Sequence, residues 1–150
     1  MTDFVAIDFE TTAYTGDGRN DPWQLGAAVV KAGEIVETRE WFFGTAQTPD
    51  FEPIMDQWDD FHPVLAGRPL AAHNTACEKT ILTRLAPLEP WGPWIDTLRI
   101  AKKRLPGLPS YTLGELCAAL GCVPEIQGRT WHDGLYDAVA CAMLALRLGA

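Results

Sequence analysis

The chain has 150 residues, of which 47% are hydrophobic and 21% charged, a balance typical of one packed globular domain. No apolar run is long enough to cross a bilayer, and the first residues lack the basic region of a signal peptide, so we expect a soluble, cytoplasmic, single-domain protein. The formal net charge of −8 by itself argues against nucleic-acid binding, although a site built for divalent cations must itself be acidic. A basic cluster at residues 102–104 suits either a solvated helix end or phosphate contacts.

Three strand-like stretches open the chain. Residues 3–9 alternate in polarity, residues 24–31 are small and β-branched, and residues 34–43 alternate again. The turn signal Ala32-Gly33 separates the last two stretches. This spacing predicts two consecutive hairpins.

The rest of the chain alternates between short strands and helices. Strands that come first and then alternate with helices predict an α/β fold, in which a mixed five-stranded sheet is flanked by helices in three layers. The predicted elements are a helix from Pro53 to about Phe61, a strand at 70–73, a helix at 75–86, a short strand and then a helix within 93–105, a helix at 111–121 that ends at Gly121, and a helix from about Gly134 to Leu148.

The chain contains four cysteines, Cys77, Cys117, Cys122 and Cys141. Three of them lie in stretches predicted to be helical and have apolar neighbours, which favours reduced thiols in or near the core. Cys117 and Cys122 lack the paired spacing and the histidine partners of a zinc site.

Two acids, Asp8 and Glu10, end a strand that is otherwise apolar. Residues i and i+2 of a strand point to the same face, so these side chains project together, with Phe4 and Ala6 behind them. A strand end at the surface could carry such a pair by chance. The pair indicates a functional site only if other acidic residues lie close to it in the fold.

Asp137 begins an apolar stripe in the last predicted helix. Cys141, Leu144 and Leu148 follow it at helical spacing, so the stripe should face the sheet. An unpaired charge there is costly and favours a cation or donor as partner. Alternatively, the carboxylate is there because the helix dipole favours a negative charge at the start of a helix, but this does not explain why the side chain should face the sheet. His132 lies in the predicted loop before this helix, where it is a candidate base beside the acid.

Glu78 has a similar setting but a competing explanation. Ile81, Leu82 and Leu85 follow it as an apolar stripe. Thr75 lies three residues before Glu78, and this spacing matches a capping box, in which the glutamate would cap its own helix. The local pattern alone favours the cap over a ligand role.

Four acids from three elements would then meet at one end of the sheet, which is unfavourable without cations. Carboxylate oxygens are hard ligands that select Mg²⁺ or Mn²⁺. Two such ions about 4 Å apart are a known arrangement for in-line attack on a phosphodiester. We therefore expect two divalent ions at Asp8, Glu10, Glu78 and Asp137, with His132 as a candidate base.

Three segments resemble the exonuclease motifs of the DEDDh family, the DnaQ-like 3′–5′ exonucleases with a ribonuclease H-like fold. They are "DFETT", "AAHNTACEKTIL" and "HDGLYDA", and "QLGAAVV", "IDTLRIAKK" and "YTLGELCAALG" also resemble connecting segments of the family. The resemblance covers nearly the whole chain. It implies a single ribonuclease H-like domain over residues 1–150. The implied activity is release of nucleoside monophosphates from the 3′ end of single-stranded DNA or RNA.

The resemblance also implies roles for the site residues. Asp8 would bridge two divalent ions, and Glu10 and Asp137 would hold the ion that activates the attacking water. Glu78 would complete the site near the other ion, and His132 would act as general base. The terminal nucleotide would be held by Thr11, Thr12 and Asn74.

The chain departs from the family pattern in places. Glu78 stands where the family usually has aspartate, Cys77 where it usually has an aromatic residue, and Ala13 where glycine is common. Residues 13–22 form a polar turn whose acids we expect to be solvated. These departures keep open a catalytically impaired nucleic-acid-binding domain, or a proofreading-type domain that works with a polymerase. A homodimer is also compatible with the resemblance.

Overall fold

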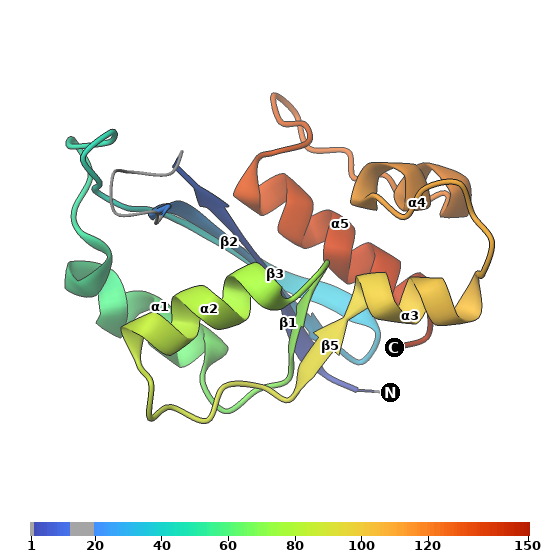
Figure 1. The fold of residues 1–150 in the computed structure, drawn as a ribbon, viewed down its shortest axis with the longest axis horizontal. Helices are drawn as coiled ribbons and strands as arrows, with labels where there is room; N and C mark the ends of the chain where they lie inside the picture. Colours follow the sequence, from blue (N-terminus) through green and yellow to red (C-terminus); the bar gives the residue numbers. More distant parts are fainter. Residues whose placement is uncertain (1, 13–19) are drawn as a thin grey trace.

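The computed structural model describes residues 2–12 and 20–150 (Figure 1). Ala13 and most of the predicted polar turn lie outside the described residues. The strands are β1 (Phe4–Thr11), β2 (Pro22–Lys31), β3 (Glu34–Phe42), β4 (Leu70–Ala72) and β5 (Trp94–Asp96). The helices are the short 3-10 helix η1 (Ile54–Gln57), α1 (Trp58–Leu65), α2 (Ala76–Leu85), α3 (Thr97–Arg104), α4 (Leu113–Leu120) and α5 (Gly134–Arg147).

The five strands form one mixed sheet in the order β3-β2-β1-β4-β5. The pairs β1–β2 and β2–β3 are antiparallel, and β1–β4 and β4–β5 are parallel. The predicted hairpins and the mixed five-stranded sheet are therefore confirmed. Ala32 and Gly33, with φ of 52° and 79°, make the turn between β2 and β3. Gly121 ends α4 in the left-handed region, as predicted.

The helix predicted from Pro53 to Phe61 is only partly correct. The chain instead forms η1 and then α1, which continues to Leu65. The break occurs at Gln57, whose side-chain amide donates to the carbonyl oxygens of Phe42 and Glu52 and ties this residue to neighbouring backbone. The helix extends beyond its predicted end because Leu65 is buried in the core.

Helices cover both faces of the sheet (Figure 1). One core packs α1 and α2 against the sheet and contains Val5, Ile7 and Phe9 of β1. The opposite core packs α5 against the sheet and contains Phe4 and Ala6. A third cluster joins α3 and α4 to α5. Because β1 alternates between the two faces, its even-numbered acids project on the α5 side.

The first turn of α5 lies very close to β2. A Cβ atom added to Gly26 would lie 2.1 Å from the carbonyl oxygen of Gly134, so only glycine permits this approach. Gly26 is also the register partner of Asp8 in the neighbouring strand. The contact therefore places the start of α5 directly beside the acidic end of β1.

Gly26→Ala is expected to lower Tm by roughly 2–12 °C. Overpacking costs about 1–3 kcal/mol, and each kcal/mol moves Tm by about 2–4 °C at this chain length. Calorimetry of the purified variant measures the effect. Gly114→Ala is the matched control, because a Cβ there meets the Trp131 ring at an ordinary 3.4 Å. An unchanged Tm for Gly26→Ala would contradict the close packing described above.

The cysteines differ in one respect from the prediction. Cys117, Cys122 and Cys141 are buried and free, whereas Cys77 is exposed, so placing it in or near the core was wrong. Cys77 precedes the buried Glu78 in α2, and the glutamate takes the inward-facing position. Within the described ranges, no helix is both long and apolar enough to span a membrane.

Candidate metal and catalytic site

Three carboxylates meet where the end of β1 lies beside the first turn of α5. One oxygen each from Asp8, Glu10 and Asp137 lie within 4.8 Å of one another. Asp8 and Glu10 come from the same face of β1, and Asp137 comes from the stripe of α5 that packs on the sheet. The structure thus brings together three of the four acids singled out in the sequence.

Two oxygens of this cluster are buried without a hydrogen-bond partner among the described residues. They are Oδ2 of Asp8 and Oδ1 of Asp137. Buried polar atoms are nearly always paired, so two unpaired carboxylate oxygens in contact range of a third acid need a counterpart. A divalent cation fits this donor set, because Mg²⁺ and Mn²⁺ prefer carboxylate oxygens.

Burial and mutual repulsion change the acidity of the cluster. Burial, followed by the hydrogen bond and charge of Glu10, raises the pKa of Asp8 well above its usual range. Burial and then the charge of Glu10 raise the pKa of Asp137 to about 7. Near neutral pH the metal-free cluster therefore retains protons, which a bound cation would displace.

Glu78 lies beside this cluster but is not one of its three members. The side chain is buried, and its Oε1 accepts a hydrogen bond from the Phe9 amide at 3.4 Å. That amide is available because β4 pairs with β1 only up to Ala6. Burial raises the pKa of Glu78 to about 7.

The capping-box interpretation of Glu78 is wrong. The Thr75 side chain makes no capping hydrogen bond to α2. The backbone amide and the hydroxyl of Thr75 both lie 3.4 Å from Oδ2 of Asp96. Asp96, which we did not single out in the sequence, also caps α3 by accepting from the amides of Leu98 and Arg99. Its position directly before a helix was the available signal.

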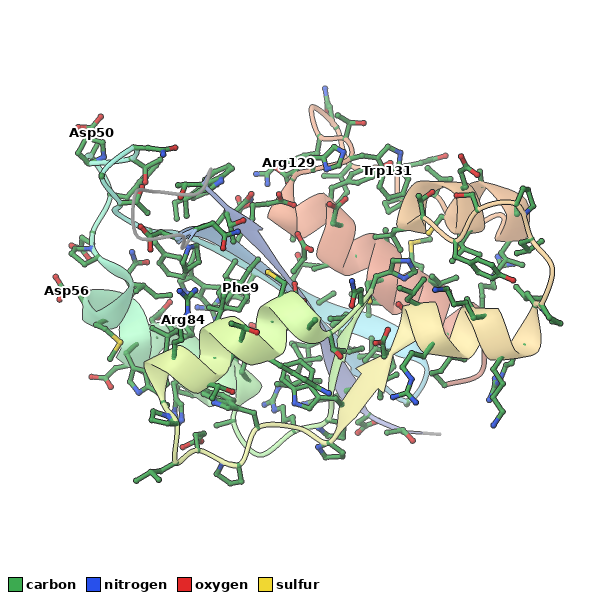
Figure 2. The ribbon with its side chains drawn as sticks, viewed as in Figure 1. Phe9, Asp50, Asp56, Arg84, Arg129 and Trp131 are labelled. Atoms are coloured by element: carbon green, nitrogen blue, oxygen red, sulfur yellow. The ribbon has the colours of Figure 1, made fainter. Side chains whose placement is uncertain are left out.

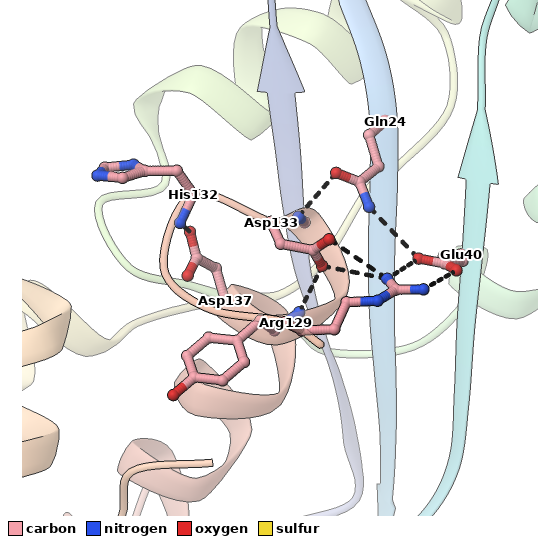
Figure 3. A network of polar contacts seen from close by, with 8 residues as sticks. Gln24, Glu40, Arg129, His132, Asp133 and Asp137 are labelled. Atoms are coloured by element: carbon pink, nitrogen blue, oxygen red, sulfur yellow. Dashed lines mark hydrogen bonds and ion pairs between the residues drawn. The ribbon is translucent and has the colours of Figure 1, made fainter. Parts of the chain in front are cut away.

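His132 lies in the loop before α5, as predicted. Its backbone amide donates to Oδ2 of Asp137 at 3.2 Å, and its φ of 70° is left-handed. The side chain is exposed, and the imidazole points away from the Asp137 carboxylate (Figure 3). The backbone of His132 is thus part of the site, while the ring is directed to solvent.

The candidate nucleotide-binding residues lie around the same end of the sheet. The Thr11 hydroxyl accepts from Nδ2 of Asn20 at 2.6 Å, and the Thr12 hydroxyl accepts from the Asp21 amide at 3.0 Å. Asn74 is exposed after β4, and its amide donates to Asp96 at 3.1 Å. The backbone of Asn74 thus fixes the turn, at a left-handed φ of 68°.

His73, next to Asn74, has a structural role. Its Nε2 lies 2.8 Å from the carbonyl oxygen of Tyr111, and its Nδ1 lies 2.9 Å from the Thr97 hydroxyl. Burial lowers the pKa of His73, which favours the neutral ring. In that form Nε2 donates to Tyr111 and Nδ1 accepts from Thr97.

The sequence reasoning missed four polar residues that connect the start of α5 to the sheet, Gln24, Glu40, Arg129 and Asp133. Arg129 and Trp131 come from the loop near the first turn of α5, whereas Phe9 comes from β1 and lies close to α2 (Figure 2). Gln24 carried a detectable signal in the sequence, because it is a polar residue within an apolar strand. In the structure it is fully buried, which is unusual for glutamine. Asp133 directly precedes a helix, which is a capping position.

A mixed sheet of this order, with helices on both faces and acids at the end of its first strand, has the ribonuclease H-like fold of the DnaQ-like exonucleases. Exonuclease X in complex with 5′ overhanging duplex DNA superposes with a TM-score of 0.73 at 22% identity, over 97% of this chain and 90% of that one. Escherichia coli exonuclease I in a zinc-bound complex with single-stranded DNA gives a TM-score of 0.72 at 15% identity, over 97% of this chain and 40% of that one. The fold that the three motifs implied is confirmed by these superpositions.

Curated relatives at the sequence level are polymerases. DNA polymerase III PolC-type from Oceanobacillus iheyensis is 29% identical over 165 aligned residues, covering 97% of this chain and 11% of the polymerase. The PolC-type polymerase of Halalkalibacterium halodurans is 28% identical, over 98% of this chain and 11% of the polymerase. The chain thus spans about a tenth of the length of these relatives. No family model matches it.

Proposed function

We propose that residues 1–150 form a metal-dependent 3′–5′ exonuclease domain that releases nucleoside monophosphates from single-stranded nucleic acid. The observation that carries the proposal is the group of three carboxylates, two of which have a buried oxygen that finds no partner in the described part of the chain. Such a group at the end of β1, on a fold shared with exonucleases X and I, suits phosphodiester hydrolysis.

The ion ligands in this proposal are Asp8, Glu10 and Asp137, with Glu78 completing the site from the α2 side. Two Mg²⁺ or Mn²⁺ ions held there would supply Lewis-acid stabilisation of the charge on the phosphate oxygens. Thr11, Thr12 and Asn74 would hold the terminal nucleotide. Burial raises the pKa of Asp8, Glu78 and Asp137, so bound cations would favour the charged form of these acids and couple catalysis to metal binding.

His132 is the proposed general base, accepting a proton from the attacking water at an imidazole nitrogen. The role requires the exposed ring to turn from solvent toward Asp137, a side-chain motion that exposed residues make on a picosecond-to-nanosecond timescale. The hydrogen bond from the His132 amide to Asp137 supports this role, because it keeps the proposed base close to a proposed ion ligand.

The test is degradation of 5′-labelled single-stranded DNA and RNA with Mg²⁺, Mn²⁺ or EDTA. A ladder that shortens from the 3′ end with either ion, and is absent with EDTA, supports the proposal and reports the sugar preference. If neither ion supports degradation, the proposed activity is wrong. Binding of the same oligonucleotides without cleavage would then favour the catalytically impaired domain.

A polymerase-associated proofreading role is a second candidate, motivated by the similarity to PolC-type polymerases. The test compares primer–template duplexes with a paired or a mispaired 3′ end. Proofreading predicts faster removal of the mispaired nucleotide, because fewer base pairs must be broken to reach a single-stranded end. Equal rates on both duplexes would argue against it.

His132→Ala is expected to lower kcat by about 10²–10⁴-fold, the usual contribution of a general base. The affinity for Mn²⁺ should stay unchanged, because only the amide of His132, not its ring, contacts an acid of the cluster. Single-turnover kinetics and a Mn²⁺ titration measure the two quantities. His62→Ala is the control, since His62 lies on α1 and pairs there with Glu89 rather than with the three carboxylates. A wild-type rate for His132→Ala would remove His132 from the mechanism.

A further inference from the structure

A network of ion pairs and hydrogen bonds centred on Arg129 fastens the loop before α5 to the sheet (Figure 3). Both guanidinium Nη atoms donate to the two carboxylate oxygens of Glu40 on β3, with 2.7 Å between Nη2 and Oε1. Nη1 also lies 3.3 Å from both carboxylate oxygens of Asp133. A forked contact of this kind fixes orientation as well as distance.

The same network also holds the first turn of α5. Gln24 is fully buried, its Oε1 accepts from the Gly134 amide at 2.9 Å, and its Nε2 lies 3.4 Å from Glu40. Asp133 caps the helix by accepting from the Tyr136 amide at 3.0 Å. Two of the otherwise unpaired amides at the helix start are therefore satisfied by network members.

Arg129 supplies the positive charge that balances the two carboxylates of the network. Its guanidinium stands between two carboxylates, and the side chains of Arg129, Glu40 and Asp133 are each only about a quarter exposed, at 28%, 24% and 27%. Water therefore screens them less than it screens surface ions. Without Arg129, Glu40 and Asp133 would lose their shared counter-charge.

The network encloses the segment that carries His132. Arg129 and Asp133 close a short loop by an i,i+4 ion pair, and His132 lies inside that loop. His132 adopts a left-handed φ of 70°, a strained conformation that persists only where the surroundings hold it. From there its amide reaches Oδ2 of Asp137. The ion pair of Arg129 and Asp133 thus restrains both the proposed base, His132, and a proposed ion ligand, Asp137.

We propose that Arg129, through its forked pair with Glu40, is a positioning residue that sets the placement of His132 and Asp137 relative to β1. The inference rests on the function proposed above. Arg129 acts in this proposal through the loop and the helix start, by its contacts with Glu40 and Asp133. Losing the pair therefore slows the chemical step while leaving substrate affinity in place.

The kinetic test compares Arg129→Met, Arg129→Lys and Arg39→Met on a single-stranded oligonucleotide. Arg39 is the matched control, because it neighbours Glu40 in β3 but pairs with Asp60 at 3.1 Å on the opposite face. Arg129→Met is expected to lower kcat by about 10-fold, a loss typical of outer-shell partners, with KM within about 2-fold. Arg129→Lys should restore part of kcat, and Arg39→Met should match wild type. A folded Arg129→Met with wild-type kcat overturns the inference, as does an equal loss in Arg39→Met.

Hydrogen exchange provides a readout that does not need activity. In the metal-free protein, the amides of His132 and Asp137 are expected to exchange about 10-fold faster in Arg129→Met than in wild type or Arg39→Met. Unchanged exchange overturns the positioning inference, whereas an inactive wild type defeats only the proposed function. If Arg129→Met does not fold, Glu40→Gln is measured in the same way; it should show a smaller loss of kcat and faster exchange, and wild-type behaviour overturns the inference.

Discussion

Asp8→Asn is expected to lower the nuclease rate by about 10³-fold or more while stabilising the metal-free protein. The rate falls because the variant removes a central ion ligand, and even one preorganised electrostatic group is worth about 10²–10³ in rate. The stability rises because burial and neighbouring acids raise the pKa of Asp8, so its charge is unfavourable in the folded state. Asparagine keeps the shape without the charge.

The measurements for Asp8→Asn are the oligonucleotide assay and Tm in EDTA and in Mn²⁺. We expect Tm in EDTA to rise by roughly 3–6 °C, equivalent to about 1–2 kcal/mol, and the Mn²⁺-induced increase to shrink. Asp3→Asn is the control, because Asp3 lies just before the other end of β1, where it accepts from the Ala32 amide. Full activity in Asp8→Asn would show that the site is assigned wrongly. A lower Tm in EDTA would show that the buried charge of Asp8 is not the main factor that destabilises the metal-free protein.

Raising the pH from about 5 to about 8 is expected to destabilise the metal-free protein. The folded-state pKa is about 7 for both Glu78 and Asp137, against usual values of 4.5 and 3.8. Across this window the folded state holds protons that the unfolded state has already released, so stability falls as pH rises. Glu78 contributes on the order of 2 kcal/mol to this loss, and Asp137 contributes less because it is more exposed to solvent.

Added Mn²⁺ should reverse this loss, and more strongly at about pH 8 than at about pH 5. Cations bind the deprotonated carboxylates, so protons compete with them at low pH. At a concentration 1,000 times its Kd, a bound ion stabilises the fold by about 4 kcal/mol. Thermal unfolding at three pH values, with EDTA or Mn²⁺, measures both effects. Glu78→Gln is the matched variant and should flatten the pH dependence in EDTA. An Mn²⁺ effect that does not change with pH would contradict the proton coupling.

A local motif gave a wrong prediction where a residue distant in the sequence binds the hydrogen-bonding groups that the motif assigns to its own members. Thr75 and Glu78 have the spacing of a capping box, yet Asp96 takes the donors of Thr75. Glu78 turns to the Phe9 amide, which is free because β4 is only three residues long. Neither competitor lies in the window that defines the motif. Cys77 is exposed because its neighbour Glu78, and not Cys77, faces the interior.

The sequence by itself determined which acids share a face. A period of two puts Asp8 and Glu10 together on β1, and a period of 3.6 turns Asp137 toward the sheet, because each periodicity is local to one element. Only the tertiary structure decided how those faces meet. The close approach of Gly26 and Gly134 and the Arg129–Glu40 pair join residues about a hundred positions apart, and the pairing of distant residues follows from packing in three dimensions, which no local period encodes.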